Sequence, residues 1–374
     1  MQVNQEKGLD MKFGLFTIVP WHESLTQSQA LHEALEQIEL ADRLGLDEVW
    51  LGEHRFSRHG LLSGFFSFAG SVVARTQHVR IGTAVVVLSL HHPILVAEEI
   101  AMLDVLSGGR MEVGVGSGYQ RQEFDGLGVD MNESRERFRE ATEVMIKAWT
   151  EETLTFHGKY TNVDNLWVLP KPVQKPHPPL YVAISTSPST VEWAASQQIQ
   201  PILGGPTDTM GQAPQALKMW RDKMDKFGHP HAHLTPPMSK GIYVTPSMDE
   251  ALNDPIGLDN FSSRILRSAG TTGATIGMPT DKHGNLPPGY EAWANRQRDR
   301  ERRDDPGHAG LPPLRGTPEV IVERLKQVQE AGVERIFGAF GFPGLPHWKV
   351  LRSIELFCTE VLPHFREVAA PAAD

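Results

Sequence analysis

The sequence has 374 residues, of which 40% are hydrophobic, enough to bury a large core. Its formal net charge is −10 and it has no long basic stripe, which argues against nucleic acid as a partner. A single cysteine, Cys358, excludes an intrachain disulfide and a cysteine-based metal site and fits a reducing compartment. The N-terminus is polar, and no apolar run approaches the ~20 residues of a membrane span. We therefore expect a cytoplasmic protein without membrane contact.

Apolar runs that predict strands alternate along the chain with segments of helical periodicity. Strands are predicted at 12–19, 48–51, 79–88, 111–116, 179–185, 201–205, 241–245 and 335–340. Helices are predicted at about 31–44, 65–75, 93–109 and 133–149, from Pro188, and at about 210–227, 318–331 and 347–365. The strands are apolar throughout, as expected where both faces of a parallel sheet are covered.

Eight successive βα units in a chain of this size predict an α/β fold, specifically a (β/α)8 TIM barrel. The alternative is a doubly wound sheet, which would carry a dinucleotide fingerprint after an early strand. The motif GVGSGY fails that fingerprint because Tyr119 occupies the place of the third glycine. We expect one domain over residues 11–366.

Two stretches do not fit a simple barrel. Residues 161–179 form a proline-rich connection before the fifth strand. Residues 253–315 form a long insertion before the last barrel units, rich in Gly, Pro, Asn and charge. Loops of that length are usually functional lids or disordered, and we interpret 253–315 as an active-site lid.

Barrel active sites lie at the C-terminal ends of the strands, so residues that follow the strands are candidate site residues. Glu53 and His54 follow the second strand, where an apolar run ends abruptly in charge. Gly116 and Ser117 follow the fourth strand, and Gly204 ends the sixth. Glycines there allow a flat ligand to approach the backbone, although each one also fits a plain turn.

The motif STSPST at 185–190 predicts an anion site. Ser187 suits the N-cap and Pro188 the first helical position, so free backbone amides point to one spot. Helix capping alone accounts for Ser187 but does not account for the additional hydroxyls of Ser189 and Thr190. Amides and hydroxyls together suit a phosphate group. No histidine cluster has the partners of a metal site, so none is expected.

Several motifs together resemble the bacterial luciferase-like flavin monooxygenase family. They are MKFGLF, VWLGEHRF, RIGTAVVVLSLHHP, GGRMEVGVGSGYQRQEFDGLG, PLYVAISTSPSTVEWAA and GTPEVIVERLKQVQEAGVERI. The resemblance runs from about Met11 to Phe365. It implies a (β/α)8 barrel and a monooxygenase that takes reduced FMN from a separate flavin reductase. Such an enzyme adds O2 to form a flavin C4a-hydroperoxide and oxidises a small organic substrate. It also implies a homodimer.

The resemblance assigns roles to individual residues. It places the catalytic histidine at His54, with Glu53 beside it to orient the ring or favour its charged form, and Arg55 where a second histidine is common. It implies a non-proline cis peptide under the flavin ring at Ala84–Val85. Further cofactor contacts are implied at Gly116, Ser117, Tyr119, Thr186, Ser187, Thr190, Leu203 and Gly204.

Two alternatives stay open on the same barrel. One is an F420-dependent oxidoreductase that transfers hydride and needs no O2. The other is a flavin-binding relative without catalytic activity. Retention of His54 at a strand end argues against the second alternative, and a cofactor-binding assay separates the first from the FMN-dependent enzyme.

Overall fold

A computed structural model describes residues 10–184, 188–204, 212–256, 258, 261, 265 and 313–366. The barrel strands are β1 (Lys12–Thr17), β2 (Glu48–Leu51), β3 (Arg80–Thr83) with its continuation β4 (Val86–Val87), β5 (Met111–Gly116), β8 (Leu180–Ala183), β9 (Gln200–Gly204), β10 (Met238–Ser239) and β13 (Arg335–Gly338). Within the described ranges these strands occupy eight parallel positions in chain order, and the pairing of β1 with β13 closes the ring. The predicted TIM barrel is confirmed.

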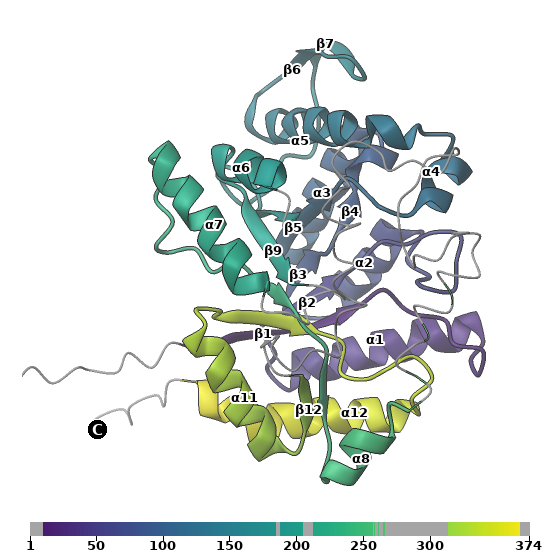
Figure 1. Cartoon of the computed structure of the whole chain (residues 1–374). Coiled ribbons are helices and arrows are strands. Elements are labelled where there is room, and N and C mark those ends of the chain that lie inside the picture. The colour runs from purple at the N-terminus through teal and green to yellow at the C-terminus, as the bar shows by residue number, and fades with distance from the viewer. Residues whose placement is uncertain are drawn as a thin grey trace, which may run out of the picture.

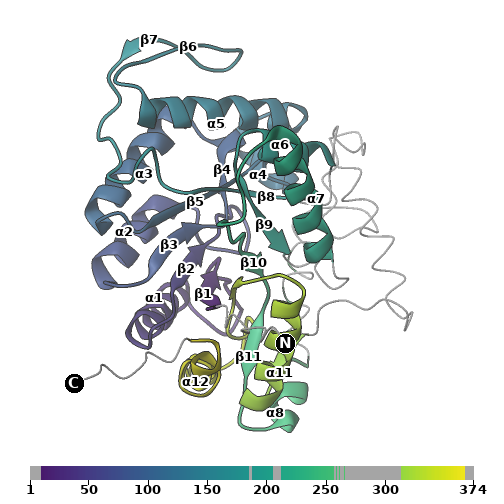
Figure 2. The same cartoon turned by 90° about the vertical axis from the view of Figure 1, so that its left-hand side faces the viewer.

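Helices surround the barrel, as Figures 1 and 2 show from two sides. They are α1 (Gln27–Arg43), α2 (Phe65–Arg75), α3 (Pro93–Ser107), α4 (Arg121–Leu127), α5 (Ser134–Thr150), α6 (Pro188–Ser196), α7 (Gln212–Phe227), α8 (Met248–Asn253), α11 (Pro318–Glu330) and α12 (His347–Leu356). None of the helices that the structure describes combines the length and apolar character of a membrane span.

Local sequence signals explain where the predicted helices begin and end. Thr26 and Gln29 form a capping box at the start of α1, each side chain accepting a hydrogen bond from the other's backbone N–H. Pro93 occupies the first turn of α3, and Gly108 ends that helix in the left-handed conformation at φ 69°. These residues fix where α1 begins and where α3 begins and ends.

The seventh barrel strand differs from its prediction. The apolar run at 241–245 forms β11 (Ile242–Val244), which pairs with β12 (Leu314–Gly316) in a separate two-stranded sheet. The barrel position belongs to β10, two residues that follow Pro236 and Pro237 and pair with β9 and β13. An apolar run also suits a small sheet packed on a helix, and the Val244 N–H donates to Ser353 of α12 at 2.9 Å. Two residues after two prolines carry no periodic signal.

Two further elements were not predicted. The connection after α5 contains an antiparallel hairpin, β6 (Leu154–His157) with β7 (Asn162–Leu166), which projects beyond α5 in Figure 1. The short helix α4 follows β5 and contributes to the site described below. The predicted lid at 253–315 lies mostly outside the described residues.

Large side chains fill the inside of the barrel below the site. Trp50 stacks on Phe337 with ring centroids 4.8 Å apart and meets Tyr181 edge-on at 5.5 Å. Gly82 makes room for Trp50, because a Cβ there would lie 2.3 Å from the indole ring. Deeper still, the buried Arg335 forms ion pairs with Glu48 and Glu112. The inside of the barrel below the site is therefore a packed core.

Candidate active site

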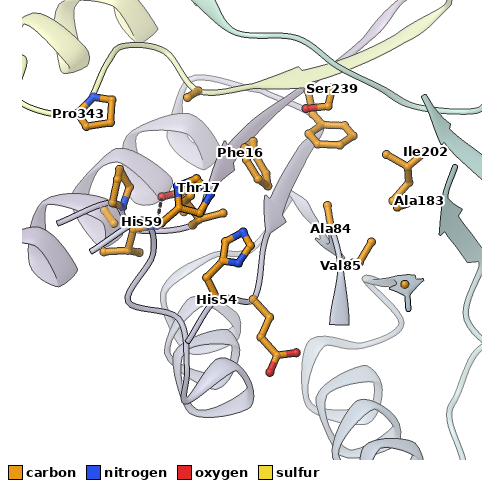
Figure 3. Close-up of a pocket in the computed structure, with 18 of the residues that line it drawn as sticks. Phe16, Thr17, His54, His59, Ala84, Val85, Ala183, Ile202, Ser239 and Pro343 are labelled. Atoms are coloured by element: carbon orange, nitrogen blue, oxygen red, sulfur yellow. Dashed lines mark hydrogen bonds between the residues drawn. The ribbon is translucent and has the colours of Figure 1, made fainter. Parts of the chain in front are cut away.

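A cavity of about 530 Å³ opens at the C-terminal ends of the barrel strands. Its lining comes from the ends of all eight strand positions and from α1, α5, α6 and α12. Figure 3 shows His54, Ala84, Val85 and Ala183 among the side chains around this space. The size suits a cofactor with a substrate beside it, since ligand pockets run from about 300 to 1,000 Å³.

Most of the sequence-predicted site residues meet at this cavity. Those that line it are Glu53, His54, Ala84, Val85, Gly116, Ser117, Tyr119, Thr190 and Gly204. Leu203 does not line it: side chains alternate along β9, so Ile202 faces the cavity while Leu203 is fully buried in the core. Thr186 and Ser187 lie outside the described residues.

His54 lies between two polar partners at its Nδ1 atom. Glu123 Oε1 is 3.1 Å away and Gln120 Nε2 is 2.8 Å away, and all three side chains are buried. When Nδ1 carries a proton it donates to the Glu123 carboxylate; when it does not, it accepts from the Gln120 amide. Both forms of the ring are therefore supported, and Nε2 engages neither of these partners.

The Glu53 carboxylate is hydrogen-bonded to groups on both sides of the loop after β2. Its carboxylate accepts hydrogen bonds from Arg55 Nε at 2.9 Å, from the Val87 N–H at 3.0 Å and from His91 Nε2 at 2.8 Å. Burial raises the pKa of Glu53, but the hydrogen bond and charge of His91, the Val87 N–H and Arg55 together bring it below its ordinary value. Glu53 thus holds the loop after β2 as an anion and does not contact His54.

Sequence reasoning missed Glu123, the carboxylate that does contact His54. Glu123 lies in α4, a helix of seven residues too short for a periodic pattern. It also accepts the Arg55 N–H at 2.9 Å, which ties the two loops together. The only sequence signal is the polar segment YQRQE directly after β5, at the barrel end where side chains converge.

One wall of the cavity is formed by small residues at the junction of β3 and β4 and at the end of β5. The peptide bond between Ala84 and Val85 is cis, as the resemblance implied, and separates β3 from β4. Gly116 faces this bond, and a Cβ on it would lie 2.8 Å from Val85 Cγ2. Tyr119 also lines the cavity, and burial raises the pKa of its hydroxyl to about 12, so the hydroxyl keeps its proton. The wall can thus carry a planar ring system.

Positive charge lies at another part of the lining. Arg135, in the first turn of α5, and Thr190, in the first turn of α6, both line the cavity. One turn further on, Phe138 of α5 packs edge-on against Trp193 of α6, with centroids 5.1 Å apart. The starts of α5 and α6 are therefore neighbours. A guanidinium, a hydroxyl and two helix starts suit a phosphate.

The chain belongs to the luciferase-like monooxygenase family, whose sequence profile matches residues 11–335. A Sinorhizobium fredii protein, y4wF, is 33% identical over 208 residues, 56% of this chain, and the match spans only 60% of that relative. The alkanal monooxygenase alpha chain of Photorhabdus luminescens is 26% identical over 96% of this chain and 98% of its own. The oxygenase component of the flavin-dependent trigonelline monooxygenase of Acinetobacter baylyi is 30% identical, over 57% and 61%.

Solved structures share the fold over nearly the whole chain. Monooxygenase RslO1 from Streptomyces bottropensis has a TM-score of 0.77 and 26% identity, covering 95% of this chain and 100% of its own. The oxygenating constituent of 3,6-diketocamphane monooxygenase from Pseudomonas putida, in complex with FMN, has a TM-score of 0.74 at 18% identity, over 97% and 99%. An F420-dependent secondary alcohol dehydrogenase has a TM-score of 0.70 at 19% identity, over 96% and 100%. The last two likenesses concern the fold alone.

Proposed function

We propose that this protein is a reduced-FMN-dependent monooxygenase that transfers one atom of O2 to a small organic substrate. The observation that carries the proposal is His54, held by Glu123 and Gln120 in the lining of a cavity that Ala84 and Val85 also line. Family membership supports the reaction class, and the trigonelline relative, an oxygenase component, supports a separate flavin reductase as partner. Reduced FMN, when bound, supplies two electrons, so that one oxygen atom enters the substrate and the other leaves as water.

The residues present fit FMN. Ala84, Val85 and Gly116 would carry the flavin ring, because all three line the cavity and none of them has a large side chain. Arg135 and Thr190 would hold the phosphate at the paired helix starts. Ser117 and Gly204 complete the predicted contacts on the lining.

His54 is the proton carrier of this proposal. When Nδ1 is protonated it donates to Glu123, and when it is deprotonated it accepts a hydrogen bond from the Gln120 amide. In this proposal Nε2 exchanges the proton with the reacting groups. An imidazole ring can both give and take a proton, so it can serve at either stage of the reaction. Glu123 is a positioning residue, since it acts through the ring of His54.

An apolar stripe on α3 supports the homodimer. Leu95, Met102 and Leu106 are 58%, 48% and 65% exposed and follow one another at intervals of seven and four residues. Such spacing lines one side of a helix and suits packing against a second helix. The partner in this proposal is a second copy of the chain, joined along α3 and away from the cavity.

The alternative cofactor is F420, and the argument for it is the fold that this chain shares with the F420-dependent alcohol dehydrogenase. Anaerobic titration followed by fluorescence separates the two proposals. We expect reduced FMN to bind more tightly than oxidised FMN, and F420 to bind at least about 100-fold more weakly than reduced FMN. Tighter binding of F420 than of reduced FMN would replace oxygen transfer by hydride transfer as the proposed reaction.

A further inference from the structure

A second histidine lines the cavity, and the proton chemistry above does not use it. His59 is 7% exposed and its ring centroid lies 4.5 Å from that of His54. Among the residues that the structure describes, its Nδ1 atom is buried and has no hydrogen-bond partner. A buried polar atom without a partner costs free energy, so a partner supplied by a ligand strengthens binding.

The backbone on both sides of His59 is held in place. The Trp21 N–H donates to the Arg58 carbonyl at 2.9 Å, and the Arg58 guanidinium stacks 3.9 Å above the Trp21 ring. The Leu61 N–H donates to the Ile18 carbonyl at 3.1 Å. Two anchors within five residues fix the loop against the end of β1, so the imidazole is presented in one position. Such preorganisation is typical of a binding residue.

His59 stays neutral throughout the working pH range. Burial lowers its pKa to about 3, and the nearby His54 adds to the effect. A neutral imidazole offers one N–H donor and one nitrogen acceptor. It can therefore pair with a hydroxyl or a carbonyl oxygen but gives no ion pair with a carboxylate.

His59 lies on the substrate side of the cavity. In Figure 3 it is beyond His54 from Ala84 and Val85, on the same side as Pro343. The segment between β1 and α1, α1 itself and the segment before α12 contribute apolar lining there, namely Val19, Leu25, Ala34 and Leu345, and α1 and α12 add the polar residues Glu33, Gln37 and His347. Apolar surface with a fixed polar group in it selects both the shape and the orientation of a small molecule.

We propose that His59 is a substrate-binding residue that hydrogen-bonds a carbonyl or hydroxyl oxygen of the substrate. The substrate class is accordingly a small, mostly apolar molecule that already carries one oxygen function, and a hydrocarbon of the same shape is discriminated against. This inference rests on the proposed function, because it takes the wall at Ala84–Val85 as the flavin side. It adds to that function a determinant of which substrates are accepted.

Matched probe pairs test the inference by binding alone. Each pair is a ketone or aldehyde and the alkene of the same skeleton, from cyclohexanone with methylenecyclohexane to decanal with 1-undecene. Dissociation constants are measured by ligand-observed NMR on wild type, His59→Phe and His59→Asn, with and without reduced FMN. Phenylalanine keeps the ring but cannot hydrogen-bond, whereas asparagine places an amide near the position of Nδ1.

Wild type should bind the oxygenated member of the pairs that fit at least about fivefold more tightly, the scale of one neutral hydrogen bond. His59→Phe should abolish that preference without weakening the alkene, and His59→Asn should keep most of it. An equal preference in wild type and His59→Phe, or no binding of any oxygenated probe, would overturn the inference. Reduced FMN titrated into the same samples reports separately on the proposed function. Thermal unfolding shows that each variant is folded.

Discussion

His54 has a carboxylate and an amide at the same ring nitrogen, and each supports a different protonation state. That arrangement could not be predicted from the sequence, where Glu53 is the adjacent acid and Glu123 lies 69 residues away. Chain neighbours after a strand point in different directions, so Glu53 turns to Arg55 and His91. His54 itself could be predicted, because it follows a buried strand at the catalytic end of a barrel.

The roles of His54 and Glu123 predict graded losses of activity. His54→Ala should lower the oxygenation rate by about 100-fold or more, the usual scale for losing a general acid or base, with flavin affinity retained. Glu123→Gln should lower the rate on the order of 10-fold, because the protonated ring loses the carboxylate that accepts its Nδ1–H. Stopped-flow kinetics over pH 5 to 9 measures both. A His54→Ala protein with wild-type rate and pH profile would make the histidine structural.

At the scale of elements, the long apolar strands and periodic helices were predictable and the short elements were not. The alternation of strands and helices from β1 to α12 predicts the fold, because most of these elements are long enough to show a hydrophobic pattern in the sequence. The seven residues of α4 and the two of β10 are placed by tertiary contacts, with no signal of their own. The phosphate-binding proposal likewise depends on two helix starts, α5 and α6, brought together by the barrel. Arg135 was not predicted because it is 55 residues from Thr190 in the chain.

Arg135 should bind the phosphate of FMN. Arg135→Ala should weaken reduced FMN by about 1–3 kcal/mol, since a charge-assisted hydrogen bond is lost, and should leave riboflavin nearly unchanged. Arg139→Ala is the matched control, an arginine one turn along α5 whose guanidinium lies 5.8 Å from the Trp193 ring and which does not line the cavity. Isothermal titration with both flavins is the measurement. Equal losses for the two flavins would place the phosphate elsewhere.

At the scale of the whole molecule, the barrel and the family were both predicted from the sequence and are both confirmed. Few folds accommodate eight buried parallel strands that alternate with helices, and among them the closed barrel leaves no strand edge open. Assembly is a different matter, because the α3 stripe becomes visible only when the exposure of each residue is known. Leu95, Met102 and Leu106 would otherwise count as core positions of an apolar helix.

The α3 stripe should hold two copies together. Met102→Lys with Leu106→Lys should convert a dimer to monomer in analytical ultracentrifugation, because two charges per chain would be buried at the interface. Trp167→Lys, a matched change at a residue that is 65% exposed beside the β6–β7 hairpin, should leave the mass unchanged. A wild-type protein that sediments as a monomer at micromolar concentration would refute the dimer.

Oxygen-isotope incorporation tests the central claim most directly. The protein is mixed with a separate flavin reductase, NADH, FMN and a panel of small ketones and aldehydes under ¹⁸O2, and products are analysed by mass spectrometry. We predict products carrying one ¹⁸O atom, formed only when the reductase is present, and lost in His54→Ala. Products that form without O2, that take their oxygen from water, or that need F420 in place of reduced FMN would contradict a flavin-dependent monooxygenase.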